Sequence, residues 1–339
     1  MSGQEGTGAR GRPDRDGAAP EGEVAGRDAG GGDASAPAIA DPALAALIAG
    51  EGADGPARLA FWREVTQGET APDSAVERRL AQDILAAYGA VPAPDLRAAR
   101  GPMLSRAASA VRAASAGADA SVDAVGDGKV ELLARHHGWR GFFGVERLDL
   151  RHRRYDGTMS GPLRREIFVM TDAVTVLPYD PLRDRVLMVE QFRAGAYGRG
   201  GGRLWQIEAV AGRIDPGETP GEAARREAVE EAGLTLSALL PVAEYYPSPG
   251  AATEYLYSFV ALTDLPQEGE SFHGLAVEGE DIRALTWPFE RAVEALRSGL
   301  ISNAPLILSL LWLTRERARL RGGAGGGGAE AEGADADGP

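Results

Sequence analysis

The chain has 339 residues, a formal net charge of −14 and no cysteine. An acidic surface repels nucleic acid backbones and anionic membranes, so we expect neither as a partner, and the lack of thiols excludes disulfides, thiol catalysis and zinc-thiolate sites. The N-terminus lacks a signal-peptide pattern, and the longest apolar run, 304–313, is too short to cross a bilayer. We therefore expect a cytoplasmic protein.

The first third of the chain divides into three segments. Residues 1–40 contain almost no large apolar side chain, so we expect a disordered tail. From 41 to 114 apolar residues recur at helical spacing, which predicts a small helical module ending in a helix over 102–114. This module shows no nucleophile, metal-ligand cluster or phosphate loop, so we assign it to packing or linkage. Small residues at 115–129 predict a linker.

A strand-rich domain is predicted from 130 to 320, followed by a disordered, acidic, Gly-rich tail at 321–339. The combination of strands and helices predicts an α/β sandwich with a mixed sheet and flanking helices. Strands are expected at 145–152, 165–168, 173–177, 186–189, 204–210, 242–246, 255–262 and 282–287, and helices at 289–298 and 303–320.

A further helix, over 220–232, is predicted inside the tract GRIDPGETPGEAARREAVEEAGL. Thr219 and Glu222 have the spacing of a capping box, and Pro220 suits the first helical position. Gly233 follows the last turn, as is typical of a helix end. The tract therefore carries both of its helix boundaries in its own residues.

Carboxylates gather on one face of this helix. Glu227, Glu230 and Glu231 are three or four residues apart, so they lie within one turn of each other. Like charges this close repel unless solvent or a cation neutralises them, and oxygen ligands without Cys or His favour Mg²⁺ or Mn²⁺. Arg226 can orient one of the carboxylates, whereas Glu218 is interpreted as bracing the turn before the helix.

The whole pattern from Gly212 onward, G-x5-E-x7-R-E-x-x-E-E-x-G-hydrophobic, is filled at every fixed position. It resembles the signature of the Nudix hydrolases, which cleave diphosphates linked to a nucleoside with a divalent metal. The tract HGLAVEGEDI is similar to a loop of the ADP-ribose pyrophosphatase branch of that family. This resemblance implies a general base at Glu278 and an additional metal ligand at Glu280, with Asp281 as the rival for either role.

Other tracts resemble the same branch: GFF, RREIF, EQFR and SPG. The resemblance implies an aromatic ring that stacks on adenine, guanidinium groups that meet phosphate, and a homodimer with swapped N-terminal strands. The helical tract before 114 is also similar to the connector of tellurite-resistance-associated Nudix proteins. The substrate-binding residues carried over are Phe142, Phe143, Arg165, Glu166, Arg193, Arg213, Ser248, Gly250 and Glu254.

The resemblance implies a Nudix-type α/β/α sandwich and a Mg²⁺-dependent, or Mn²⁺-dependent, ADP-ribose diphosphatase that yields AMP and ribose 5-phosphate. Glu231, Glu278 and Glu280 form the expected catalytic set. Two alternatives stay open: the same reaction on GDP-mannose or another nucleotide sugar, and a non-hydrolysing ADP-ribose sensor, which would not need a full set of carboxylates. The metal ligands implied are Glu227, Glu230, Glu231, Glu280 and the backbone carbonyl of Ala211.

Overall fold

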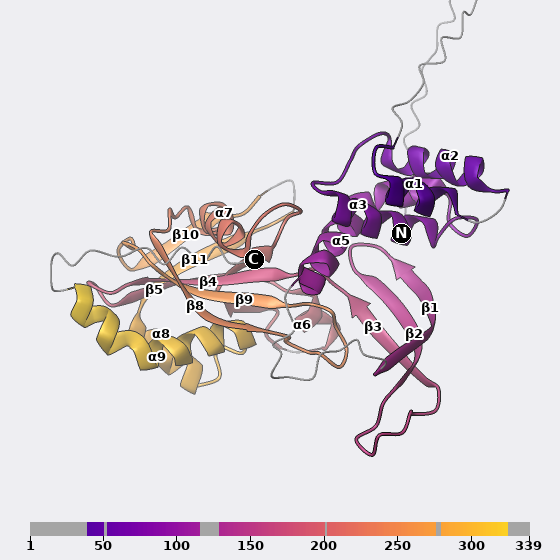
Figure 1. The fold of residues 1–339 in the computed structure, drawn as a ribbon. Coiled ribbons are helices and arrows are strands. Elements are labelled where there is room, and N and C mark those ends of the chain that lie inside the picture. The colour runs from indigo at the N-terminus through magenta and orange to yellow at the C-terminus, as the bar shows by residue number, and fades with distance from the viewer. Residues whose placement is uncertain (1–38, 51–52, 116–128, 201, 276–278, 325–339) are drawn as a thin grey trace, which may run out of the picture. The chain divides into compact units, whose positions relative to one another are not determined.

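The computed structural model describes residues 39–50, 53–115, 129–200, 202–275 and 279–324. Most of the expected N-terminal tail, residues 116–128 of the expected linker and the C-terminal segment from 325 lie outside these ranges. The residues from Ala40 onward form one compact unit, in which helices come first and strands follow (Figure 1).

Helices occupy the part of the chain before the strands. Asp41 and Asp73 cap two of them by accepting hydrogen bonds from the first backbone N–H groups. Pro94 lies in the first turn of a third, where its missing N–H costs nothing. The helices are α1 (Pro42–Ala49), α2 (Gly55–Thr66), α3 (Ser74–Leu85), α4 (Ala93–Ala98) and α5 (Arg100–Ser115).

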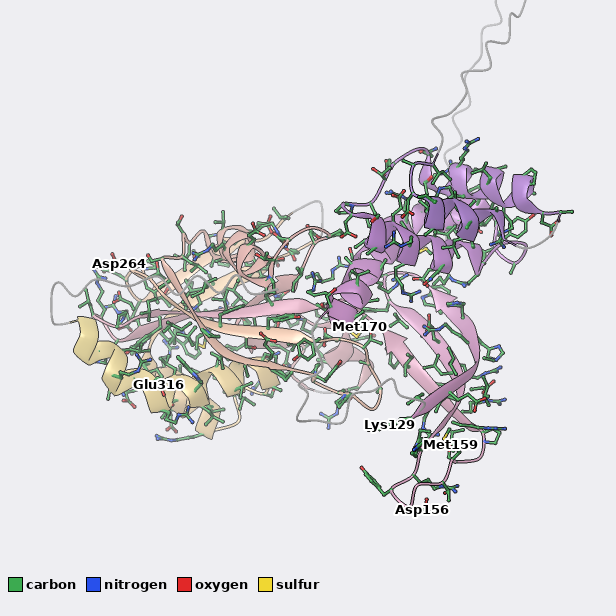
Figure 2. The ribbon with its side chains drawn as sticks, viewed as in Figure 1. Lys129, Asp156, Met159, Met170, Asp264 and Glu316 are labelled. Atoms are coloured by element: carbon green, nitrogen blue, oxygen red, sulfur yellow. The ribbon has the colours of Figure 1, made fainter. Side chains whose placement is uncertain are left out.

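A three-stranded antiparallel sheet follows, in the order β1 (Val130–Arg140), β2 (Gly144–His152) and β3 (Leu163–Val169). A tight turn at 141–143 joins the first two strands. Figure 2 labels Asp156 and Met159 in the longer connection between β2 and β3. Several large apolar side chains of this sheet are exposed, namely Val130, Leu132, Leu133, Trp139 and Phe168.

The second sheet is mixed and forms the centre of the strand-rich region. Its main path runs β10-β11-β5-β4-β9-β8, with β6 paired to β5 and β7 paired to β4. The β4–β9 pair is parallel, whereas the neighbouring pairs are antiparallel, which confirms the predicted mixed sheet. The strands are β4 (Ala173–Asp180), β5 (Arg185–Phe192), β6 (Trp205–Glu208), β7 (Val210–Arg213), β8 (Ala238–Tyr245), β9 (Leu256–Leu262), β10 (Gly269–His273) and β11 (Ile282–Pro288).

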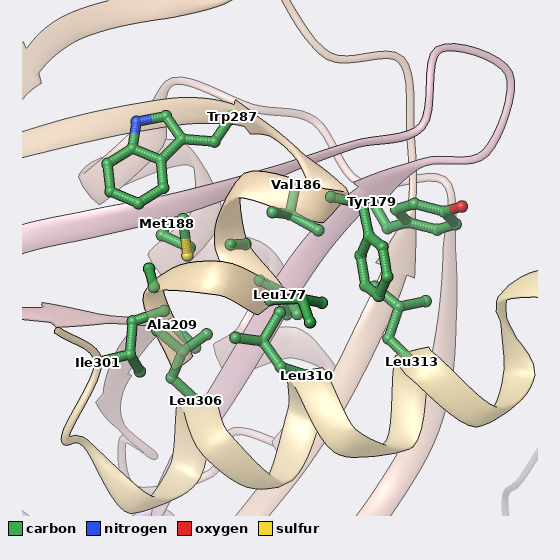
Figure 3. Close-up of a cluster of buried hydrophobic side chains, with 14 of the residues drawn as sticks. Leu177, Tyr179, Val186, Met188, Ala209, Trp287, Ile301, Leu306, Leu310 and Leu313 are labelled. Carbon is green, nitrogen blue, oxygen red and sulfur yellow. The ribbon is translucent and has the colours of Figure 1, made fainter. Parts of the chain in front are cut away.

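Helices cover both faces of this sheet (Figure 1). On one face the alanines of α7 (Pro220–Ala232) pack against Val174 and Val189. On the other face α8 (Phe289–Arg297) and α9 (Ala304–Ala324) pack against Leu177 and Met188 (Figure 3). Alternate side chains of β4 and β5 therefore enter two different cores, as expected for strands buried on both sides. The predicted α/β/α sandwich is confirmed.

The strands β4 and β5 form a fork. They pair only where Tyr179 and Asp180 face Val186 and Arg185, and then separate. Beyond that point β7 pairs with β4, and β6 pairs with β5. The prediction of one continuous strand over 204–210 is therefore wrong, because its two halves pair with different arms of the fork.

Several features lie outside the predicted elements, among them the strands β1 and β10. The short helix α6 (Ala194–Gly198) follows β5, and α9 continues to Ala324, past the end expected at 320. Among the helices in the described ranges, none has the length and apolarity needed to cross a bilayer.

Candidate active site

The carboxylate helix α7 begins and ends where the sequence predicts. The Thr219 hydroxyl accepts the Glu222 N–H at 3.3 Å, and the Glu222 carboxylate accepts the Thr219 N–H at 2.8 Å. Gly233 ends the helix at φ 64°, a left-handed conformation that glycine adopts without strain. The capping box and glycine stop are confirmed, and they fix which residues of α7 face β7.

Glu231 is the most deeply buried of the predicted ligands, with 1% of its surface exposed. Its carboxylate accepts the Ala211 N–H from β7 at 2.9 Å and the Gln191 Nε2 from β5 at 3.3 Å. Burial raises the pKa of Glu231 to about 8, against the Ala211 hydrogen bond, which lowers it. The Glu231 carboxylate is thus held by β5, which is one arm of the fork, and by β7, which pairs with the other arm.

Glu227 packs directly against the backbone of Gly212 in β7. A Cβ on Gly212 would lie 1.8 Å from Glu227 Oε1, so only glycine leaves room for this carboxylate. Burial raises the pKa of Glu227 to about 7, although Arg226 Nη1 donates a hydrogen bond to it at 2.6 Å. Gly212, the first residue of the sequence pattern, therefore makes space for the Glu227 side chain of α7.

Arg226 connects the acidic residues of this region. Its Nε and Nη2 each donate to the Glu218 carboxylate at 2.9 Å, and its Nη1 donates to Glu227 and, at 3.0 Å, to Glu230. These contacts, first of all the hydrogen bonds with Glu218, raise the pKa of Arg226. Glu218 also accepts the Asp215 N–H at 3.0 Å, so it braces the turn before α7 as predicted.

The acidic loop tract begins beside the end of α7. The Gly274 N–H donates to the Glu230 carbonyl at 3.3 Å, directly after β10. The Glu280 carboxylate accepts the Leu275 N–H at 3.1 Å, and the Glu280 N–H donates to the Leu275 carbonyl at 3.3 Å. The two described ends of this loop are therefore hydrogen-bonded to each other, and the first end is bonded to α7.

Charge links Glu280 to the helix carboxylates. Burial is the main cause of the raised pKa of Glu227 and of Glu231, and the negative charge of Glu280 contributes to both. Asp281 is exposed. Glu278, the residue expected to act as general base, lies outside the described residues. Glu280 thus acts electrostatically on the α7 carboxylates, and its role as an additional metal ligand stays a prediction.

A second polar cluster surrounds Arg193, at the end of β5. Its Nε and Nη2 donate to Glu208 Oε2 at 2.8 and 2.7 Å, and Asn303 Nδ2 donates to Glu208 Oε1 at 2.8 Å. Burial raises the pKa of Glu254, while the positive charge of Arg193 lowers it. Arg193 also lowers the pKa of Glu231. Arg193 thus acts electrostatically on both Glu254 and Glu231, and the binding of substrate by Arg193 and Glu254 stays a prediction.

The predicted aromatic residues lie on the turn between β1 and β2. Phe142 and Phe143 are 55% and 44% exposed, with their ring centroids 4.8 Å apart in an edge contact. The Arg213 guanidinium lies 4.1 Å from the Phe142 ring centroid. The Arg213 carbonyl accepts a hydrogen bond from Arg226 Nη2 at 2.9 Å. This aromatic turn is thus connected to α7 through one residue of β7.

The remaining predicted substrate residues lie elsewhere. Arg165 and Glu166 are exposed on β3, where Arg165 Nη1 donates to the carbonyl of its neighbour at 2.8 Å. Ser248 and Gly250 lie in the loop after β8, and the Ser248 carbonyl accepts two backbone N–H groups of that loop. Within the described residues, no hydrogen bond or ion pair joins these four residues to α7.

Three polar residues that were not in the predicted site belong to it. Gln191 holds Glu231, and Glu208 and Asn303 hold Arg193. Gln191 lies near the end of β5 and Glu208 is the last residue of β6, and both are buried. A buried polar residue needs a partner, but the sequence around these two residues carries no signal that names one.

The acidic site suits a hard divalent cation. Its donors are oxygen atoms, and two of its carboxylates, Glu227 and Glu231, are buried with raised pKa values, so their negative charges lack full compensation. Gly212 provides the close backbone approach that keeps Glu227 in this position. In the part of the chain that the structure describes, no three His, Cys, Asp or Glu side chains are arranged so that together they could hold a metal ion.

This chain is similar to a known family and to several known proteins. The NUDIX domain family matches residues 169–306. The ADP-ribose pyrophosphatase of Escherichia coli (strain K12) is 40% identical over 196 residues, which cover 58% of this chain and 93% of that protein. The GDP-mannose pyrophosphatase of Cronobacter sakazakii is 35% identical over 159 residues, covering 47% and 79%. A crystal structure described as ADP compounds hydrolase is 22% identical, covering 58% and 100%, with a TM-score of 0.46.

The chain combines a mixed sheet between helices with a glutamate-rich helix, α7, that packs against Gly212 of β7. This combination is the one expected of a Nudix hydrolase. The chain belongs to this family, whose members generally need a divalent metal. The family match begins at Val169, so the helices α1 to α5 lie outside it.

Proposed function

We propose that this chain hydrolyses ADP-ribose to AMP and ribose 5-phosphate with Mg²⁺ as its metal. The observation that carries the proposal is the 40% identity over 93% of an ADP-ribose pyrophosphatase, in a chain that also packs Glu227 and Glu231 of α7 against β7. A protein that only bound ADP-ribose would not need this set of carboxylates, so their presence favours an enzyme over a sensor.

The residues that would hold the metal are those of the acidic site. Glu227, Glu230, Glu231 and Glu280 would supply carboxylate oxygens, and Ala211 would supply its backbone carbonyl. When bound, a divalent cation screens the charge of a diphosphate and lowers the pKa of a coordinated water. Arg226 fixes Glu227 and Glu230 in orientation through its Nη1 group.

Other residues of the chain would bind the substrate and move the proton. Glu278 would take the proton of the water that attacks the adenosyl phosphate. Arg193, fixed by Glu208, would direct its guanidinium donors at the diphosphate. The exposed rings of Phe142 and Phe143 would offer an apolar face to the adenine base.

A hydrolysis panel tests the proposal. The full-length protein is incubated with ADP-ribose, GDP-mannose, NADH or diadenosine polyphosphates, with Mg²⁺ and with a chelator, and the products are separated. We expect the highest kcat/KM for ADP-ribose, with AMP and ribose 5-phosphate as products and no reaction with the chelator. A higher kcat/KM for GDP-mannose would instead support the second candidate, which the 35% identity to a GDP-mannose pyrophosphatase favours.

The close packing at Gly212 makes a specific prediction. In Gly212→Ala the new Cβ would overlap Glu227 Oε1, so the carboxylate must move, and we expect turnover to fall by about a hundredfold, as for a misplaced reacting group. Gly221→Ala is the matched control, because a Cβ there meets only Leu239 at 3.7 Å. Equal rates in the two variants would contradict the assigned role of Glu227.

We also propose a homodimer with swapped N-terminal strands, in which β3 reaches the partner subunit. The exposed apolar side chains of this sheet, including Leu132 and Trp139, support a covered surface. Arg165 and Glu166 of β3 would then serve the site of the partner subunit, while Ser248 and Gly250 would line the sugar side. Light scattering should give twice the mass of one chain, and a monomer at all concentrations would exclude this arrangement.

A further inference from the structure

The helix α5 contacts the aromatic turn through a buried arginine. Arg106 is only 9% exposed, and its Nη1 donates to the carbonyls of Gly141 and Phe142, at 3.2 and 3.1 Å. The turn is closed by a hydrogen bond from the Gly141 N–H to the Phe143 carbonyl at 3.0 Å. Since one guanidinium nitrogen binds two consecutive carbonyls, it restrains the backbone of the turn that carries the Phe142 and Phe143 rings.

The same face of α5 makes a second contact. Ser109 and Arg112 follow Arg106 at intervals of three, so the three side chains lie along one side of the helix. The Ser109 hydroxyl accepts the Asp172 N–H at 2.8 Å, and Arg112 Nε donates to the Asp172 carboxylate at 2.6 Å. The Asp172 carbonyl accepts the Ile214 N–H at 3.1 Å. The helix α5 is therefore bound to the start of β4 and, through Asp172, to the residue after β7.

Both contacts lead to the same place in the site. Arg213, which precedes Ile214, lies over the Phe142 ring, and its carbonyl is bound by Arg226 of α7. A series of direct contacts thus runs from Arg106 to the carboxylate helix. The family match covers residues 169–306, so both α5 and the aromatic turn lie outside it.

The chemistry of Arg106 differs from that of a residue used for packing alone. Burial lowers its pKa, and the charges of Asp83 and Glu146 oppose that effect. Both acids line a small cavity with Arg106 and Arg140. Burying a guanidinium costs free energy unless its donors are used, and an apolar side chain would fill the space at lower cost. The contact with the turn carbonyls is what an apolar residue could not provide.

We propose that Arg106 is a positioning residue that orients the Phe142–Phe143 turn to receive the purine ring, so that the helical module forms part of the substrate site. This inference rests on the proposed function, because it assigns the turn to the base of a nucleotide. It differs from the expectation that the module serves only packing or linkage.

The test compares Arg106→Met with wild type. The affinity for AMP and for ribose 5-phosphate is measured by calorimetry, and KM and kcat are measured with ADP-ribose. We expect AMP to bind about tenfold more weakly, the size of one lost stacking contact, with ribose 5-phosphate binding unchanged. KM should rise while kcat stays close to wild type, because the carboxylate helix is not altered.

Two further variants separate positioning from general destabilisation. Arg97→Met is the matched control, since Arg97 donates to the Glu64 carbonyl at 3.0 Å inside the helical module, and we expect unchanged AMP binding. In Phe142→Ala, adding Arg106→Met should cause little extra loss, because Arg106 acts through that turn. Additive losses in the double variant would show that Arg106 acts elsewhere and would overturn the inference.

The possible failures can be told apart. Wild-type AMP affinity in Arg106→Met overturns the inference even if ADP-ribose is cleaved. Absence of ADP-ribose cleavage by the wild type overturns the proposed function, while AMP binding still decides the role of Arg106. If Arg106→Met does not fold, Arg106→Gln replaces it, because its shorter side chain does not reach the carbonyls of Gly141 and Phe142. Weaker AMP binding in Arg106→Gln would support the inference, and wild-type binding would overturn it.

Discussion

Glu231→Gln should lower the turnover of ADP-ribose by about a thousandfold or more, since removing a metal ligand forfeits several kcal/mol of transition-state stabilisation. The carboxylate of Glu231 is surrounded by two donors, the Ala211 N–H and the Gln191 amide. A glutamine can accept from only one of them with its oxygen and must point its own NH₂ at the other. The variant therefore loses both the charge and the orientation of this ligand.

The matched control is Glu222→Gln on the same helix. It removes one negative charge from α7 as well, but glutamine can still complete the capping box with Thr219. We expect wild-type turnover in this control, and circular dichroism should show a folded protein for both variants. Mg²⁺ titration by calorimetry should show weaker binding only for Glu231→Gln. Normal turnover in Glu231→Gln would exclude the metal assignment.

Glu278→Gln should reduce kcat by about 10² to 10⁴, the usual contribution of a general base, and should change KM much less. The reason is that glutamine keeps the size of the side chain but cannot take the proton of the attacking water. The expectation comes from the position of Glu278 in the acidic loop tract. Steady-state kinetics with ADP-ribose at saturating Mg²⁺ measure both constants.

Asp281→Asn provides the comparison, because Asp281 is the rival base in the same tract. If Glu278 is the base, Asp281→Asn should keep most of kcat. A large fall in kcat for Asp281→Asn, with a small one for Glu278→Gln, would reverse the assignment. Glu280→Gln should behave differently from both, with weaker Mg²⁺ binding, because the charge of Glu280 acts on Glu227 and Glu231.

The helix α7 could be predicted to the residue because its signals are local. Thr219 and Glu222 lie in one turn, and Gly233 ends the helix by its own backbone conformation. The spacing of Glu227 and Glu231 also gave their shared face, since helical geometry alone decides it. The α/β/α sandwich could also be predicted, because apolar strands occur together with helices along the chain. Apolar strands must be covered on both faces, and the helices provide that cover.

Features that depend on distant pairing were not visible in the sequence. The strand β10 is mostly exposed and polar, so it has no alternating pattern, and it exists because it pairs with β11. The division of 204–210 into β6 and β7 follows from the fork, which no local signal marks. The bond from Gln191 to Glu231 spans 40 positions, and the one from Asn303 to Glu208 spans 95. Only the folded chain brings such pairs together.

The fork between β4 and β5 limits how this site could be transplanted. Glu231 accepts hydrogen bonds from Ala211 of β7, which pairs with the β4 arm, and from Gln191 of the β5 arm. The position of this carboxylate therefore depends on the gap between the two arms. Grafting the α7 sequence alone onto another scaffold would therefore carry over the helix but not the ligand geometry. A functional graft would have to include both arms of the fork, the strand β7, and the point at Tyr179 and Asp180 where the arms pair.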